Sequence, residues 1–151
     1  MTRKQKITLG ASVSGLGIAY LIYNSISRKN LFNKIYSAIG GNEINISLYN
    51  EWFNPNYYTQ FSDGYIFLTS SNVLSKARKL GDAFESWGNN SDEILGVFRA
   101  IPDGVALSQI AEKFEAKGYG DLRTKVGDLN KDELSQVGQI LSQKQPFRKS
   151  S

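Results

Sequence analysis

A long uncharged stretch near the start of the chain is its most distinctive pattern. Residues Ile7 to Tyr23 contain no charged side chain, and the uncharged run continues to Ser27, 21 residues in all. A helix of about 20 mostly apolar residues crosses a hydrocarbon layer about 30 Å thick. The apolar residues here do not fall on one stripe, as they do in a surface helix. We therefore predict a membrane-spanning helix whose apolar residues are Ile7, Leu9, Val13, Leu16, Ile18, Leu21 and Ile22.

Two alternatives to this membrane anchor stay open. The basic start, the apolar run and a small-residue step at Ser25-Ile26-Ser27 also fit a cleaved signal peptide. The other alternative is a helix buried against protein.

Small residues at Ala11, Gly15 and Ala19 recur every four positions and share one helix face, which allows a second helix to approach closely in lipid. We expect homo-oligomers or a partner helix at this face.

The helical pattern resumes behind this stretch. Residues 28–39 fit a short helix that Gly40-Gly41 ends, and aromatic residues then crowd between Tyr49 and Phe61. Bulky side chains of this kind fill gaps between helices more often than they form a binding surface, and we favour packing. Residues Tyr65 to Thr69 fit a short strand or an extended link.

Five amphipathic helices follow in about seventy residues, so the predicted fold class is all-α. The first begins at a cap on Ser71 or Asn72 and runs to Ser86. The start and stop signals of the others are Asn90 to Glu93, Pro102-Asp103-Gly104, Gly118, Asp121, and Asn130 to Glu133. The predicted organisation is an anchor with basic flanks (1–28), a short helix with an aromatic-rich connector (29–70), a helical bundle (71–142) and a basic flexible tail (143–151).

Charge is distributed unevenly along the chain and strengthens the membrane prediction. The net charge is +4, yet residues 1–34 hold six bases and no acid, while the rest holds twelve bases and fourteen acids. Bases beside an apolar span bind anionic lipid headgroups. The predicted headgroup ligands are Arg3, Lys4, Lys6, Arg28 and Lys29. Three bases lie on each side of the span, so charge does not indicate its orientation. The body lacks a basic stripe, and we expect no nucleic-acid partner.

The order of elements over residues 73–141 resembles a single annexin repeat. An alanine-ended helix, a glycine turn, an acidic helix start and an aromatic-glycine step occur in a similar order there. The residues that carry the resemblance are Ala83, Trp87-Gly88, Ser91-Asp92-Glu93-Ile94, Tyr119-Gly120, Asp121-Leu122 and Asp128-Leu129. It covers less than half of the chain. A looser resemblance connects such units with small virion or structural proteins of bacteriophages.

The annexin resemblance implies a calcium site, the one cofactor considered for this chain. Carbonyl groups of Trp87, Gly88 and Asn89 and the carboxylate of Asp128 would be its ligands. Calcium takes six to eight oxygen ligands, which leaves room for water or phosphate. The simpler interpretation is that Gly88 turns the chain and Asp128 ends a helix.

No catalytic constellation is recognisable. Histidine and cysteine are both absent from the sequence, which removes the commonest general base and metal ligands. A cell-wall hydrolase using Glu85, Glu93 or Glu115 is the remaining enzymatic alternative. Solvated acids and a helix cap are the ordinary explanation of these residues, and we expect a protein that is not an enzyme.

These patterns predict a single-pass membrane protein with a structural or interaction role. We expect the bilayer and other protein subunits as partners. If the bacteriophage resemblance applies, the bilayer is the internal membrane of a virion and the partners include capsid proteins. A calcium-dependent module that binds anionic lipid and a membrane-bound cell-wall hydrolase are the alternatives.

Overall fold

The computed structural model describes residues 51–86, 88 and 90–151. Within them a short 3-10 helix and five α-helices follow one another, in agreement with an all-α fold. The elements are η1 (Tyr57–Gln60), α4 (Ser70–Glu85), α5 (Ser91–Ala100), α6 (Gly104–Ala116), α7 (Leu122–Gly127) and α8 (Lys131–Ser142).

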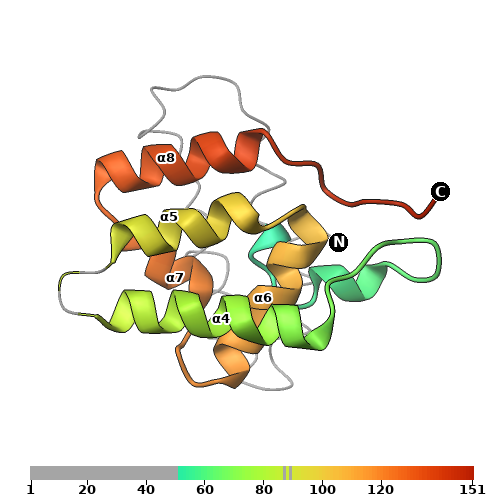
Figure 1. The fold of residues 1–151 in the computed structure, drawn as a ribbon, viewed down its shortest axis with the longest axis horizontal. Coiled ribbons are helices and arrows are strands. Elements are labelled where there is room, and N and C mark those ends of the chain that lie inside the picture. Colours follow the sequence, from blue (N-terminus) through green and yellow to red (C-terminus); the bar gives the residue numbers. More distant parts are fainter. Residues whose placement is uncertain (1–50, 87, 89) are drawn as a thin grey trace, which may run out of the picture.

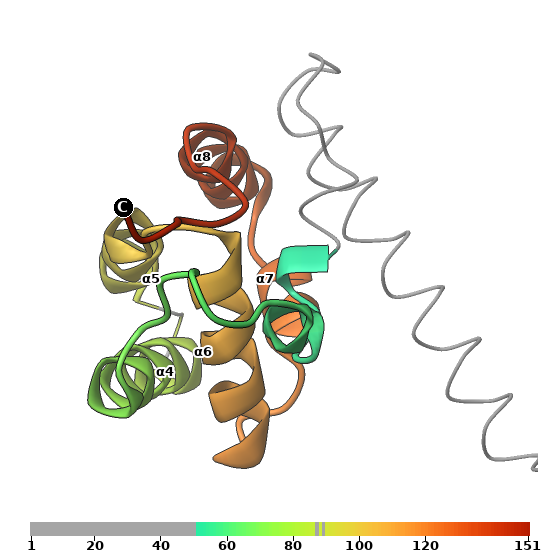
Figure 2. The ribbon, with the colours of Figure 1, turned by 90° about the vertical axis from the view of Figure 1, so that its right-hand side faces the viewer.

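Helices α4, α5 and α8 form one layer, and α6 crosses behind it (Figure 1). The view turned by 90° shows α8, α5 and α4 stacked at one side, with α6 beside them and η1 and α7 beyond it (Figure 2). Helix α6 contacts α4, α7 and η1, and α5 contacts both α4 and α8. Helix α6 is therefore the central element, and one side of the α4–α5–α8 layer has no helix of the described part of the chain packed on it.

The core follows the predicted apolar faces. Fully buried side chains come from every α-helix and from the aromatic segment before η1, and the largest are Trp52, Phe53, Phe98, Phe114, Leu80, Ile94, Ile101, Leu107, Ile110, Leu122 and Leu141. Burying a side chain of this size contributes about 1.5–3 kcal/mol relative to leaving it in water. The packing interpretation of the aromatic segment is confirmed for Trp52, Phe53 and Tyr57, while Tyr49 lies outside the described residues.

Side-chain caps begin most of these helices. Asn130 and Glu133 form a reciprocal capping box at α8, as predicted. Asp121 accepts a hydrogen bond from the Thr124 backbone at α7, also as predicted. The first described α-helix starts earlier than expected, because the extended residue Thr69, and not Ser71 or Asn72, is its N-cap.

Two connecting segments complete the described fold. Residues 65–69 form the extended link, one of the two alternatives expected for them, and no regular strand, although Tyr65 makes an isolated antiparallel bridge with Lys149. The predicted flexible tail is docked on the domain over residues 145–150. Backbone N–H groups of Ile66, Gly104 and Val105 donate to carbonyl groups of the tail. The bonds from Gly104 and Val105 are favourable because the first N–H groups of a helix have no partner within the helix.

The predicted membrane span cannot be placed in this fold. No helix among residues 51–86, 88 and 90–151 is long and apolar enough to cross a membrane. The span Ile7–Tyr23 and the short helix at 28–39 both lie outside those residues.

Candidate interaction surface

The residues predicted to contact lipid lie outside the described part of the chain. This holds for the whole apolar set from Ile7 to Ile22, for the face Ala11, Gly15 and Ala19, and for all five headgroup bases. The described residues instead show which polar groups of the helical domain serve its structure and which line its surface.

The residues of the implied calcium site are only partly described. Gly88 has a φ of +80°, a left-handed conformation that suits a turn. Asp128 is the exposed C-cap of α7, where its backbone N–H donates to the Lys125 carbonyl. The described residues contain no group of three or more His, Cys, Asp or Glu side chains that could hold a metal ion. Trp87 and Asn89 lie outside those residues.

The three carboxylates considered for hydrolysis do not share an environment. Glu93 exchanges hydrogen bonds with Asn90 at the start of α5: its backbone N–H donates to Oδ1 at 3.4 Å, and Oε2 accepts from Nδ2 at 3.1 Å. Glu85 ends α4 and Glu115 is exposed near the end of α6. Helix capping therefore accounts for Glu93.

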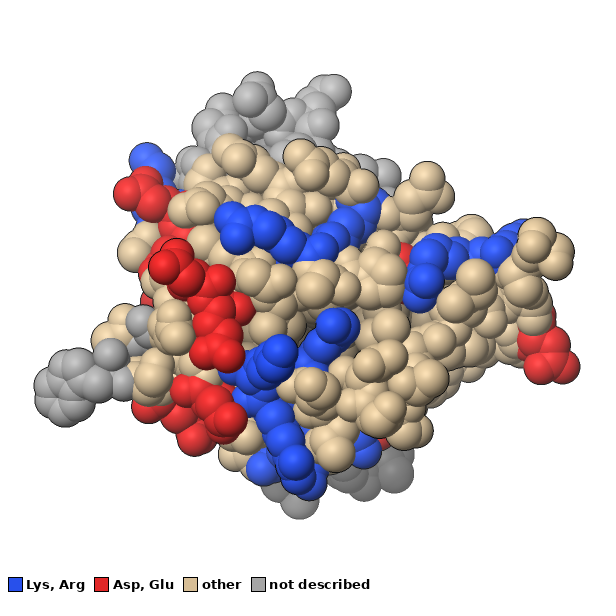
Figure 3. Space-filling view, in the orientation of Figure 1, with Lys and Arg blue, Asp and Glu red and all other residues tan. Residues whose placement is uncertain are grey.

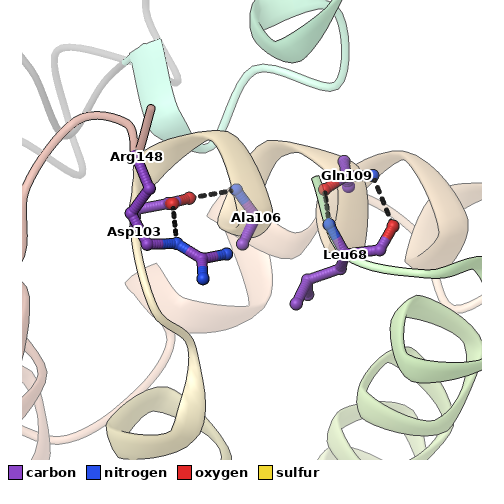
Figure 4. A network of polar contacts seen from close by, with 5 residues as sticks. All are labelled: Leu68, Asp103, Ala106, Gln109 and Arg148. Carbon is purple, nitrogen blue, oxygen red and sulfur yellow. Dashed lines mark hydrogen bonds and ion pairs between the residues drawn. The ribbon is translucent and has the colours of Figure 1, made fainter. Parts of the chain in front are cut away.

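An ion pair at the start of α6 joins a buried aspartate to a partly exposed arginine of the C-terminal tail. Asp103 is fully buried, and its two oxygens accept from the Ala106 backbone at 2.7 Å and from Arg148 Nε at 2.6 Å (Figure 4). Asp103 thus caps α6 and holds the tail at the same time. Each oxygen therefore accepts a bond that holds the fold together.

A second polar contact on α6 fixes the extended segment before α4. The Gln109 amide accepts from the Leu68 backbone N–H at 3.0 Å and donates to the Leu68 carbonyl at 3.2 Å (Figure 4). Ser108 is buried one position earlier and donates to the Asn54 carbonyl at 2.6 Å. Backbone groups of these irregular segments therefore form hydrogen bonds with side chains of α6, where a strand or helix would pair them with other backbone groups.

The outer side of the α4–α5–α8 layer carries a cluster of bases, which we call the basic face. It comprises Lys76 and Lys79 of α4, Arg99 of α5 and Lys144, which follows α8. Lys and Arg side chains gather across the middle of this side of the molecule (Figure 3). These residues lie far apart in the sequence, and helix packing brings them together.

Two open hollows lie within the basic face. The hollow between α5 and α8 has a volume of about 340 Å³ and is lined by Arg99, Gln136, Gln139, Ile140, Gln143 and Lys144. The hollow between α4 and α5 has a volume of about 240 Å³ and is lined by Ser75, Lys76, Lys79, Glu93, Gly96, Val97 and Ala100. Each therefore presents two cations beside small or amide-bearing side chains.

Lys144 is held in place at the edge of the larger hollow. Its Nζ donates to the Arg99 carbonyl at 3.1 Å, which satisfies one of the unpaired carbonyl groups at the end of α5. Burial lowers the pKa of Lys144, while the charge of Asp103 acts in the opposite direction. An ammonium has three donors, and the Arg99 carbonyl takes one of them.

Acidic residues border the basic face at one end. Asp92 and Glu93 lie in the first turn of α5, and Asp132 and Glu133 lie in the first turn of α8. Asp and Glu side chains gather in Figure 3 on the side where α5 and α8 begin. Carboxylates at these positions are stabilised by the helix dipole. Apart from Glu93, which also lines the smaller hollow, the two signs of charge are thus separated along the same side of the layer.

Sequence reasoning did not find the basic face. Lys76 and Lys79 show the three-residue spacing of one helix side, which is a weak signal in any amphipathic helix. Lys144 was assigned to a flexible tail, and nothing local links it to Arg99. Only the packing of α8 against α5 could reveal this contact.

Comparison of the chain with known protein families, with curated proteins and with solved structures finds no match. The annexin and bacteriophage resemblances therefore stay predictions, and the function has to be argued from the residues themselves.

Proposed function

We propose that this chain is a single-pass membrane protein with a structural role, whose helical domain docks onto a protein partner. The observation that carries the proposal is the charge distribution. An uncharged run of 21 residues, Ile7–Ser27, lies between two groups of three bases, in a segment of 34 residues without a single acid. A bilayer explains both features together, because lipid excludes charge from the span and anionic headgroups attract the flanks.

Polar residues of the helical domain fall into two groups, and the group on its surface supports an interaction role. Asp103, which caps α6, and Ser108 and Gln109 within it are engaged in bonds that hold the domain together. The charged residues of the basic face instead line open hollows. A surface with paired cations and hollows suits an oppositely charged partner, because complementary charge steers and orients binding.

The resemblance to bacteriophage proteins indicates where this role would be carried out. As a minor virion protein, the chain would sit in the internal membrane of a bacteriophage and its helical domain would contact the capsid. Self-association through Ala11, Gly15 and Ala19 would then set the number of copies in each cluster.

Membrane fractionation tests the anchor. We expect the full-length protein to stay with membranes through extraction at high pH, and a chain without residues 1–27 to appear in the supernatant. The matched control is Lys117→Glu with Lys131→Glu, which changes charge in the exposed parts of the domain but leaves the span intact. If the truncated chain also stays in the membrane after extraction, the assignment of the anchor to Ile7–Tyr23 is wrong.

A further inference from the structure

We infer that the basic face binds an acidic segment of a protein partner, laid across the two hollows on either side of α5. The inference deepens the proposed function and rests on it, since it names the chemistry of the partner onto which the domain docks. Its basis is the juxtaposition of Lys76 and Lys79 in one hollow with Arg99 and Lys144 in the other.

The concentration of positive charge here does not follow from the overall composition. Residues 51–151 carry twelve bases and thirteen acids, so the described domain is close to neutral. Four of the twelve bases nevertheless line two neighbouring hollows, and the one acid among the lining residues is Glu93 in the smaller hollow. Oppositely charged partners bind to such a patch faster and in a preferred orientation.

The hollows also provide room for side chains of a partner. A Cβ atom added to Gly96 would meet no atom within 4 Å, so the floor of the smaller hollow is open. Ala100 is the next residue on the same side of α5, one turn further on. A partner backbone can therefore approach α5 closely while its carboxylates reach the cations on both sides.

The amide side chains of the larger hollow favour a peptide. Gln136, Gln139 and Gln143 each offer a donor and an acceptor, and a peptide backbone offers both in return. A partner that accepts hydrogen bonds only would use half of this capacity.

The same face argues against nucleic acid and against a lipid surface. Asp92, Asp132 and Glu133 lie at the end of the face where α5 and α8 begin and would repel a continuous run of phosphates. Neither hollow is lined by an aromatic residue on which a base could stack. An acidic protein segment avoids both difficulties, because its charge can be confined to the part that faces the cations.

Fluorescence anisotropy with a defined probe tests the inference. The probe is a labelled helical peptide of alternating glutamate-rich and alanine-rich turns, about 20 residues or about 30 Å long. Full-length protein in a non-ionic detergent is titrated at salt concentrations between about 0.05 M and about 0.3 M, since screening weakens contacts between exposed charges. The quadruple variant Lys76→Glu, Lys79→Glu, Arg99→Glu and Lys144→Gln removes the cations of the basic face.

We expect the parent to bind the peptide with an affinity that falls as salt rises, and the quadruple variant to lose about tenfold or more in affinity. The control pair Lys117→Glu and Lys131→Glu has exposed bases that line neither hollow, and it should lose less than about twofold. Should the quadruple variant unfold, the pair Lys76→Gln and Lys79→Gln is used instead, because it leaves the Lys144–Arg99 contact intact.

Three outcomes would overturn the inference. The first is peptide binding that is undetectable, or that both sets of variants weaken equally. The second is tighter binding of single-stranded DNA or of a soluble short-chain phosphatidylglycerol than of the peptide. The third is a dimer of the chain itself that only the quadruple variant dissociates in sedimentation velocity. Each is measured in detergent solution, so failure here is distinguishable from failure of the membrane anchor in fractionation.

Discussion

Behind the α4–α5–α8 layer, the charged side chain of Asp103 is buried and bonded to the start of α6 and to the C-terminal tail. In front of the layer, Lys76, Lys79 and Arg99 line hollows that open to solvent. On both sides the charged residues lie at helix ends or on helix surfaces, so position in the sequence does not distinguish the two groups. The surroundings decide their role: a charge taken out of water needs a partner, whereas an exposed charge costs the fold little.

The comparison predicts that removing the buried charge of Asp103 has the largest effect. We expect Asp103→Ala to lower the free energy of unfolding by about 3 kcal/mol, because it removes both a hydrogen bond to a charged group and a helix cap. Chemical denaturation followed by circular dichroism measures this change. Asp128→Ala is the control, since this exposed aspartate at the end of α7 should cost less than about 0.5 kcal/mol. Equal costs at the two positions would contradict the distinction between buried and exposed charges.

Two glycines sharpen the same comparison with identical substitutions. A Cβ on Gly104 would collide with the Trp52 indole, whereas a Cβ on Gly96 would meet nothing within 4 Å. We expect Gly104→Ala to destabilise the protein by about 1–3 kcal/mol, since a filled core has no room for another atom. Gly96→Ala should stabilise it by about 0.5–1 kcal/mol, because alanine favours the helix. Thermal unfolding of the two variants should therefore shift in opposite directions, and shifts of the same sign would contradict the described packing.

What the sequence predicted well was local. The capping residues Asn90, Asp121 and Asn130 act within three residues of themselves, and each caps the expected helix. The apolar faces were equally readable, because burial repeats with the period of the helix. The aromatic segment was predicted to pack because side chains as large and apolar as those of Trp52 and Phe53 are ordinarily buried, and both are buried here.

What the sequence could not predict depends on contacts between distant residues. Arg148 and Asp103 are 45 positions apart, as are Lys144 and Arg99. The tail of residues 143–151 looked flexible because it is short, polar and follows the last helix. Its docking depends on the N-terminus of α6 and on Asp103, which donate and accept the bonds to the tail, and no local pattern shows this.

Alkaline pH provides a smaller test of the packed side through Tyr57. Burial raises the pKa of this phenol above its ordinary value of 10.0, and the charge of Glu51 adds to the shift. The folded state thus prefers the neutral phenol, so this contribution to stability is complete below pH 10.0 and is lost as pH rises through the raised pKa. We expect the free energy of unfolding of the parent to fall more steeply above pH 10.0 than that of Tyr57→Phe. Denaturation curves at several alkaline pH values check this, and parallel slopes would contradict the burial of the hydroxyl group.

The smallest change in stability is expected for a variant that reverses two charges on the surface of the domain. Lys76→Glu with Lys79→Glu reverses two charges on the front of α4, yet neither residue forms an ion pair among the described residues. Surface substitutions of this kind usually change the free energy of unfolding by less than about 0.5 kcal/mol. Chemical denaturation should therefore place this variant within that range of the parent, while the same sample loses affinity for the glutamate-rich peptide. A loss of stability as large as that of Asp103→Ala would mean that the lysines serve the fold. Unchanged stability together with weakened peptide binding would show that Lys76 and Lys79 serve the binding of a partner, whereas Asp103 on the other side of the layer serves the fold.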